Sequence, residues 1–231
     1  MRFYGLQKLT LLDYPDKVAA TVFTGGCPWR CPFCHNADLV FLPEAMETIS
    51  SEEVLQYLKK RSGVLDGICI SGGEPLMHSD LESFIRQCKE LGLSVKLDTC
   101  GCYPDRLKSL VEKQLIDYVA MDIKNSPERY AETIGLAKAP LGKVRESIDF
   151  LRQTDIPYEF RCTVVAEFHQ KKDIHELGDW LAGSPVCYLQ KFVDSGNTIE
   201  PGLHACSDEE MREFQKILMQ YMTKVELRGV D

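Results

Sequence analysis

Short apolar, β-branched runs alternate along this chain with stretches whose apolar positions recur at helical spacing. The runs that are typical of strands lie at 18–24, 67–71, 93–99, 116–124, 157–166 and 187–193, and the tail at 225–228 suits a last short strand. Helices are expected at 51–62, 79–91, 104–113, 127–134, 141–153, 174–182 and 208–222. This alternation predicts βα units built around a parallel sheet.

The number of units bounds the architecture. A complete TIM barrel needs eight βα units and roughly 250 residues, whereas this chain has 231 residues and about six strand–helix units. We therefore predict an α/β fold, a partial TIM-type (βα)6 barrel with mostly parallel strands. One domain is expected over residues 1–231, with a lead-in at 1–16, a barrel core at 17–193 and a C-terminal loop and helix at 194–231.

Strand side chains point alternately to the two faces of a sheet, so the apolar positions define which neighbours face the barrel interior. The residues expected inside are Cys69, Ser71, Lys96, Asp98, Asp122, Lys124, Arg161 and Thr163, followed on the last strand, where the phase is ambiguous, by Tyr188, Gln190 and Phe192. Buried charges must be paired or held by a ligand. A structural ion-pair network competes well for Lys96, whereas Asp98, Asp122 and Lys124 favour a ligand pocket.

Charge and cysteine content narrow the function classes. Lysine and arginine number 27 against 35 aspartates and glutamates, giving a net charge of −8. Such a balance disfavours nucleic acid and membrane surfaces as partners. The N-terminus lacks a signal-peptide pattern and no apolar run reaches membrane-spanning length, so a cytoplasmic protein is expected. Ten cysteines in that compartment indicate metal ligation or reduced thiols rather than disulfides.

Three of the cysteines follow the first expected strand, as Cys27-x3-Cys31-x2-Cys34, and His35-Asn36 comes directly after them. Three thiolates on one short loop suit a cubane iron–sulfur cluster that has one iron left open for a small molecule. The competing interpretation is a zinc knuckle, whose fourth ligand would be His35 or a distant cysteine.

The cysteine spacing, with an aromatic residue just before Cys34, resembles the radical S-adenosylmethionine (SAM) superfamily. His35-Asn36 and the lead-in Leu12-Asp13-Tyr14-Pro15 resemble the glycyl-radical-enzyme activases within it. Within that group the lead-in looks most like the activating proteins of anaerobic ribonucleoside-triphosphate reductase, with the pyruvate formate-lyase activases as close relatives. The resemblance extends over residues 9–193.

The resemblance implies a role for each matching residue. Cys27, Cys31 and Cys34 would ligate a [4Fe–4S] cluster whose open iron is chelated by the amino and carboxylate groups of SAM. The remaining SAM contacts would come from Phe33 and His35 at the adenine, from the Gly72-Gly73-Glu74 motif at the amino group, from Lys124 and Arg161 along the ligand, and from Gln190 near the ribose. Asp98, Thr99 and Asp122 match positions that surround a monovalent cation in pyruvate formate-lyase activase.

The implied reaction needs no catalytic residues beyond the cluster ligands. A flavodoxin or ferredoxin-type donor would reduce the cluster, SAM would be cleaved reductively, and a Cα hydrogen would be taken from a glycine of a partner glycyl radical enzyme. The lateral opening of an incomplete barrel could admit a loop of that partner. The alternatives are a pyruvate formate-lyase-type activase, a radical SAM enzyme acting on a small molecule like 7-carboxy-7-deazaguanine synthase, and a zinc-binding module.

Cys100-Gly101-Cys102 departs from the resemblance, because most pyruvate formate-lyase activases have asparagine at the position of Cys100. We interpret the pair as reduced thiols near the mouth of the barrel, with a redox or auxiliary-metal role as the alternative hypothesis. The chain has no ferredoxin-like insert between the early cysteines and Gly72, so a second cluster is not expected.

Overall fold

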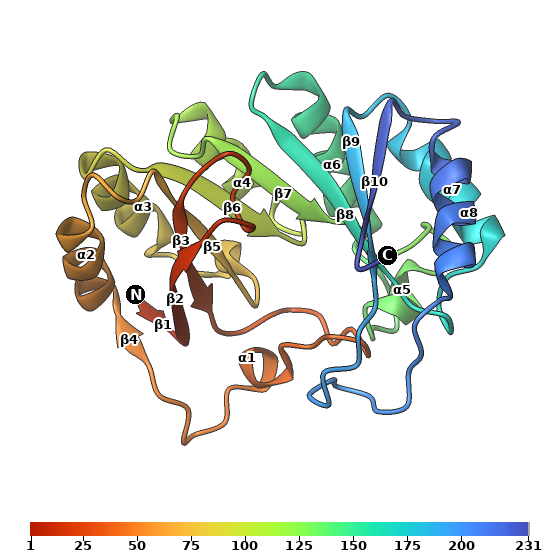
Figure 1. Ribbon diagram of the computed structural model, residues 1–231, viewed down its shortest axis with the longest axis horizontal. Helices are drawn as coiled ribbons and strands as arrows, with labels where there is room; N and C mark the ends of the chain where they lie inside the picture. Colours follow the sequence, from red (N-terminus) through yellow and green to blue (C-terminus); the bar gives the residue numbers. More distant parts are fainter. Residues whose placement is uncertain (231) are drawn as a thin grey trace.

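A computed structural model describes residues 1–230 as one large curved sheet with helices packed around it (Figure 1). The large sheet has eight strands in the order β10-β9-β8-β7-β6-β5-β3-β2. All neighbouring strands run parallel except β2 and β3, which are antiparallel. The strands are β2 Gly5–Thr10, β3 Ala19–Thr24, β5 Gly67–Gly72, β6 Ser94–Thr99, β7 Tyr118–Asp122, β8 Tyr158–Val164, β9 Val186–Lys191 and β10 Lys224–Arg228. A separate antiparallel pair is formed by β1 Arg2–Phe3 and β4 Ile49–Ser50.

Most helices lie along the convex outer face of the large sheet (Figure 1). They are α1 Ala37–Phe41, α2 Ser51–Lys60, α3 Leu81–Glu90, α4 Pro104–Glu112, α5 Tyr130–Thr133, α6 Leu141–Gln153, α7 Lys171–Leu181 and α8 Asp208–Leu218, with a 3-10 turn at Pro75–Met77. Among the described residues, no helix is both long enough and apolar enough to cross a bilayer. Their amphipathic sequences instead bury one face against the sheet.

The sheet curls without closing, because β2 and β10 are its two edges. This confirms the prediction of a partial barrel with mostly parallel strands, and every strand expected from the sequence is present, including the last short one. The alternation is confirmed as well. Ile68, Ile70, Val95 and Leu97 are fully buried between sheet and helices. Their sequence neighbours therefore face the barrel interior.

The structure differs from the predicted elements in the lead-in, which supplies β1 and the antiparallel edge strand β2. Helix α1, within the loop that follows the cysteines, was also not anticipated. Helix α7 begins at Lys171, earlier than expected, because Gln170 and Asp173 form a capping box there. The large sheet runs from β2 to β10, so it crosses the expected boundaries at residues 17 and 193.

Candidate active site: a cysteine-lined cavity at the strand ends

A cavity of about 290 Å³ opens at the carboxyl ends of the parallel strands, a size within the usual range of small-molecule sites. The sequence-predicted site residues that line it are Cys27, Cys31, Phe33, Cys34, His35, Gly72, Gly73, Asp98, Thr99, Asp122, Lys124, Arg161 and Gln190. Ser71 and Thr163, which were expected inside the barrel, line it too. Residues from distant parts of the chain therefore meet in one place.

The cysteine loop is held from several sides. The Arg30 backbone N–H donates to the carbonyl of Ile134 at 2.9 Å, and the Arg30 guanidinium Nη1 donates to the carbonyl of Cys27 at 2.6 Å. Trp29 is buried and meets the Tyr130 ring edge-on, with 5.8 Å between the ring centroids. These contacts fix the path of the loop before any ligand binds.

The three thiols fit an iron–sulfur cluster better than a zinc ion. Cys27, Cys31 and Cys34 are free thiols on one cavity wall. Within the described chain, His, Cys, Asp and Glu ligand atoms gather within 4.8 Å of one another only at a different place, so these three sulfurs and His35 do not converge as zinc ligands do. A cubane, whose iron atoms sit apart, suits such a wider spacing.

Burial controls the protonation of these thiols. It raises the pKa of Cys27 and of Cys31 to about 12, although the nearby ammonium of Lys124 acts in the opposite direction on Cys31. Both thiols therefore hold their protons at neutral pH until a metal takes their place. The pKa of His35 is lowered, first by burial and then by Lys124, so its imidazole is neutral at pH 7.

An alternating row of charges crosses the barrel interior and ends at the cavity; we call it the ion-pair chain. Lys96 Nζ lies 2.5 Å from Asp98 Oδ1, and Asp98 Oδ2 lies 3.1 Å from Arg161 Nη1. Arg161 Nε then lies 2.8 Å from Asp122 Oδ1, and Asp122 Oδ2 lies 3.1 Å from Lys124 Nζ. Three cations thus face two carboxylates. Of the two lysines, Lys124 lines the cavity, where its ammonium suits the carboxylate of a ligand.

The ion-pair chain keeps all its members charged. Burial opposes ionisation of Asp98 and Asp122, but Arg161 and the flanking lysines outweigh it and hold the pKa of both carboxyls below the ordinary range. Burial likewise opposes the charge of Lys124, yet Asp122 raises the pKa of that ammonium above its usual value. The predicted network and the predicted pocket thus overlap: Asp98, Asp122, Lys124 and Arg161 line the cavity, whereas Lys96 does not.

Gly72 and Gly73 shape the cavity wall by packing against protein backbone. Gly72 has φ +113°, and a Cβ there would lie 2.4 Å from the backbone of Thr24. A Cβ on Gly73 would lie 2.0 Å from the carbonyl oxygen of Gly26. Only glycine fits at either position, because β5 and the start of the cysteine loop approach so closely.

Glu74 is the predicted site residue that does not line the cavity. Its carboxylate is fully buried behind the wall and accepts hydrogen bonds from the backbone N–H of Leu76 at 3.0 Å and of Cys100 at 2.7 Å, and from the Thr99 hydroxyl at 2.8 Å. Glu74 therefore joins the loops after β5 and β6 rather than reaching into the cavity.

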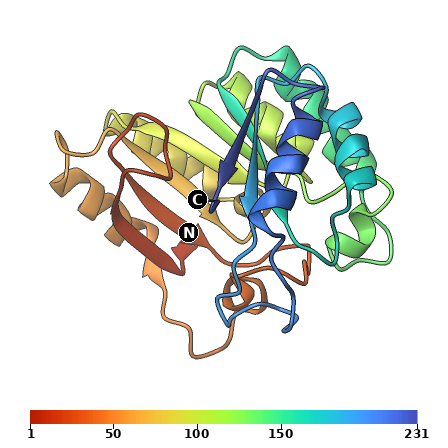
Figure 2. The ribbon, with the colours of Figure 1, turned by 45° about the vertical axis from the view of Figure 1, so that its right-hand side comes forward.

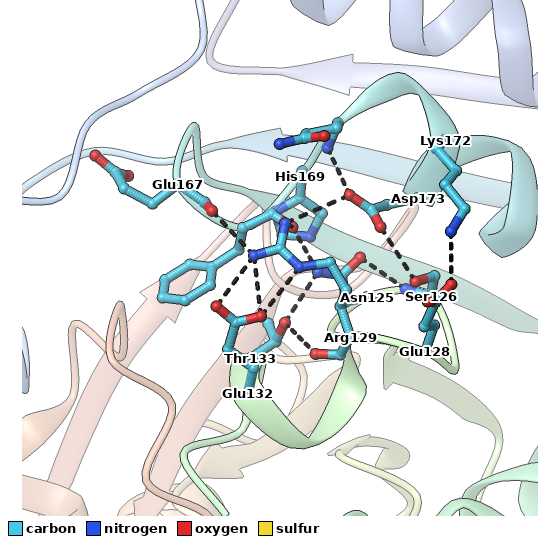
Figure 3. Close-up of polar contacts among 12 residues, drawn as sticks. Asn125, Ser126, Glu128, Arg129, Glu132, Thr133, Glu167, His169, Lys172 and Asp173 are labelled. Atoms are coloured by element: carbon cyan, nitrogen blue, oxygen red, sulfur yellow. Dashed lines mark hydrogen bonds and ion pairs between the residues drawn. The ribbon is translucent and has the colours of Figure 1, made fainter.

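A second polar cluster, drawn in Figure 3, joins the loop after β7 to the loop after β8; we call it the bracing network. The Asn125 amide donates to the carbonyl of Phe168 at 2.7 Å, and Arg129 Nη1 donates to the same oxygen at 2.7 Å. His169 Nε2 makes a hydrogen bond to the carbonyl of Lys124 at 2.9 Å. Since Lys124 ends the ion-pair chain, the bracing network fixes its backbone.

The bracing network also supports the adenine side predicted at Phe33. The Phe33 ring packs on Phe168 with 6.0 Å between centroids.

Segment 194–206 approaches from the C-terminal half and lies beside α1 in both views (Figures 1 and 2). There the Glu200 N–H donates to the carbonyl of Pro32 at 2.9 Å, and the Asn197 amide donates to Asp38 at 3.1 Å.

Sequence reasoning missed several residues of the site. Asp13 lines the cavity from the lead-in, where its carboxylate accepts a hydrogen bond from the Thr21 hydroxyl at 2.5 Å. On β9, where the sequence leaves the phase ambiguous, Gln190 lines the cavity, and Tyr188, paired in register with Arg161, faces the interior as predicted and stacks under the guanidinium of Arg228. Phe192 follows the end of β9 and is buried outside the cavity lining. The pairing of β10 with β9, which brings Arg228 beside Tyr188, had no signal in the sequence pattern.

Comparison with known proteins agrees with this site. A Radical SAM superfamily profile matches residues 21–181. A putative glycyl-radical enzyme activating enzyme of Methanocaldococcus jannaschii is 30% identical over 98% of this chain and 95% of its own length. The pyruvate formate-lyase-activating enzyme of Listeria monocytogenes is 27% identical over 80% of this chain and 77% of its own. The crystal structure of Streptococcus suis SuiB bound to S-adenosylmethionine shares the fold, with a TM-score of 0.69 at 14% identity, over 89% of this chain and 49% of that one.

Members of this superfamily use a [4Fe–4S] cluster and SAM, and the three thiols and the charged cavity described above fit both. The Radical SAM profile matches most of the chain, and both curated relatives are named as activating enzymes. The chain therefore belongs to the radical SAM superfamily and, within it, to the family of glycyl-radical-enzyme activating enzymes.

Proposed function

We propose that this protein activates an anaerobic ribonucleoside-triphosphate reductase by removing a Cα hydrogen atom from one glycine of that partner. The observation that carries the proposal is the convergence of Cys27, Cys31 and Cys34 with the ion-pair chain in one cavity at the strand ends. The choice of partner depends on the similarity of His35-Asn36 and of the Leu12-Asp13-Tyr14-Pro15 lead-in to that subgroup.

In this proposal Cys27, Cys31 and Cys34 hold the [4Fe–4S] cluster. A reduced cluster held by these residues would supply the electron for reductive cleavage of SAM, the chemistry that removal of the glycine hydrogen requires. Lys124, the cation at the open end of the ion-pair chain, pairs with the SAM carboxylate. Phe33 and the neutral His35 offer an aromatic edge for the adenine, and Gln190 offers an amide for the ribose.

The protein's other task is to position the reacting groups of SAM and the partner glycine and to exclude water from them. Tyr130, which packs against Trp29, and the 194–206 segment, which bonds to Pro32, both contact the cysteine loop. The gap between the edge strands β2 and β10 would admit the glycine loop of the partner. A flavodoxin or ferredoxin-type protein would deliver the electron. The monovalent cation stays a prediction, since Asp98 and Asp122 are already paired with protein cations.

Electron paramagnetic resonance tests the proposal. The cluster-loaded chain, SAM and dithionite are mixed without oxygen with a candidate anaerobic ribonucleoside-triphosphate reductase, and a glycine-centred doublet is expected in the reductase. A doublet only in a pyruvate formate-lyase would transfer the proposal to that partner. SAM cleavage that yields no protein radical in either would favour the small-molecule alternative. A Cys34→Ser chain should give no signal, whereas Cys88→Ser, which lies in the core of α3 far from the cavity lining, should give the full signal.

A further inference from the structure

The loop after β6 holds two thiols in contact that the reaction above does not use. Cys100 Sγ donates to Cys102 Sγ across 3.2 Å, and both cysteines are free. The residue between them is Gly101, whose φ of +75° folds the backbone so that both side chains point to the same side. The turn is fixed by the Ser147 hydroxyl, which donates to the carbonyl of Gly101 at 2.7 Å.

We propose that Cys100 and Cys102 form a second redox site, a dithiol that a low-molecular-weight disulfide such as oxidised glutathione converts reversibly into an intramolecular disulfide. A disulfide needs a sulfur–sulfur bond of about 2.05 Å, so closure asks the two sulfurs to move by only about 1 Å. Cys100 lines the cavity, which gives a small reagent a route to an otherwise buried pair. The site does not depend on the proposed function.

The exchange balances in two steps. Cys100, which lines the cavity, attacks one sulfur of the small disulfide and releases one thiol. Cys102, whose Sγ lies 3.2 Å away, then attacks the Cys100 sulfur of this mixed disulfide and releases the second thiol. The two protons of the protein thiols end on the two released thiols, and two electrons pass from the protein to the reagent.

A metal ion is the competing occupant, because ligand atoms of Glu74, Cys100 and Cys102 lie within 4.8 Å of one another. Two observations favour the disulfide. The Glu74 carboxylate already accepts three hydrogen bonds from protein donors. The sulfurs are also closer, at 3.2 Å, than the roughly 3.7 Å that two thiolates span on a tetrahedral zinc ion with Zn–S bonds of about 2.3 Å.

Formation of the Cys100–Cys102 disulfide should affect the cavity wall. The Cys100 N–H that holds Glu74 belongs to the residue whose sulfur must move, and Glu74 in turn holds the segment that follows Gly73. The redox state of the pair is therefore linked to the cavity wall at Gly72 and Gly73, which packs against the start of the cysteine loop.

The test uses the full, cluster-loaded chain, kept free of oxygen and equilibrated with mixtures of reduced and oxidised glutathione. After acid quenching and alkylation, trypsin cleaves behind Lys96 and Arg106, and the peptide 97–106 contains Cys100 and Cys102 but no cluster ligand. We expect an unalkylated form of this peptide, lighter by its two thiol hydrogens, that increases with oxidised glutathione and disappears with dithiothreitol. Complete alkylation at every ratio would overturn the proposal.

Variants make the result specific. Cys102→Ser should trap glutathione on Cys100 as a stable mixed disulfide, because the second step is lost. Cys206→Ser, a buried cysteine outside this loop, should leave the midpoint unchanged. The pair could instead be protected from alkylation only when zinc is present, with no change in peptide mass and with reversal by a chelator. That result would replace the disulfide with a metal site.

Discussion

Two buried polar regions of this protein differ in the partners that their side chains bind. In the ion-pair chain, side chains bond to side chains, and the row ends in Lys124 with one cation in excess. In the bracing network, side chains such as Asn125 and Arg129 bond to backbone carbonyls of a neighbouring loop (Figure 3). The first arrangement leaves charge available to a ligand, whereas the second uses its donors to fix loop geometry.

The comparison teaches that burial alone does not identify a binding group. Asn125 and His169 are as deeply buried as Lys96, yet most of their hydrogen bonds are made with main-chain atoms. What distinguishes the ion-pair chain is its unequal count of charges and its position at the cavity. Substitutions in the two regions should therefore separate binding from stability.

The largest expected effect is at the centre of the ion-pair chain. Arg161→Met removes the cation between Asp98 and Asp122 and leaves two buried carboxylates next to each other. We expect the free energy of unfolding to fall by about 3–5 kcal/mol, measured by urea denaturation without oxygen. Arg86→Met, which breaks only an exposed pair with Glu82, is the control. Equal midpoints for the two variants would contradict the role given to the chain.

Acid should weaken the same region. The pKa values of Asp98 and Asp122 in the folded chain lie below the unfolded value of about 3.9. Their contribution to stability is therefore complete above that pH and is lost as the pH falls through the folded pKa values. Urea midpoints of the cluster-free chain should drop in this acid range, and the drop should be smaller in Arg161→Met. An identical slope in both chains would show that other groups titrate.

Lys124→Gln tests binding with less effect on stability. Arg161 still neutralises Asp122, but the charge at the cavity is lost. A charge-assisted hydrogen bond contributes about 1.5–3 kcal/mol, so the SAM dissociation constant of the cluster-loaded chain should rise roughly 10- to 100-fold. Calorimetry measures it, and Lys172→Gln on the outer surface is the matched control. Unchanged affinity would remove Lys124 from the proposed SAM contacts.

Asn125→Ala should show the reverse behaviour. It takes a donor from the Phe168 carbonyl and from Thr133, which costs about 1–3 kcal/mol of stability for buried groups. The SAM affinity of the folded, cluster-loaded chain should change by less than roughly three-fold. A loss of affinity as large as that of Lys124→Gln would mean that bracing and binding are not separable.

The smallest effect is expected at the exposed margin of the bracing network. Lys172 pairs with Glu128, and both side chains are largely in solvent (Figure 3). Surface ion pairs of this kind contribute little. Lys172→Ala should therefore leave both the urea midpoint and SAM binding unchanged, and a clear shift in either would extend the network to the surface.

The sequence was sufficient for prediction where strand alternation or the spacing of the cysteines determined the structure. Strand alternation correctly placed Asp98, Asp122, Lys124 and Arg161 in the interior, because the period of two leaves only one choice once the apolar face is known. The cysteine spacing and its flanking residues led to the correct family. The individual ligand contacts stay predictions.

The sequence was insufficient in turns and at the edges of the sheet. The Glu74 side chain follows a turn at Gly73, where no alternation rule gives its direction, and it is directed toward buried backbone donors. Asp13 reaches the cavity through the geometry of a loop. Strand β2 has a half-exposed, weakly alternating sequence, and it is defined by its pairing with β3 rather than by its own propensity.

The contact of Gly72 and Gly73 with the backbone of β3 and the cysteine loop has an evolutionary consequence. Any larger residue at either position would push two main-chain segments apart, so selection for a foldable chain is enough to keep both glycines unchanged. If both glycines are invariant among homologues, the steric requirement alone would explain it. A library of random substitutions selected only for soluble expression should therefore lose most variants that replace Gly72 or Gly73.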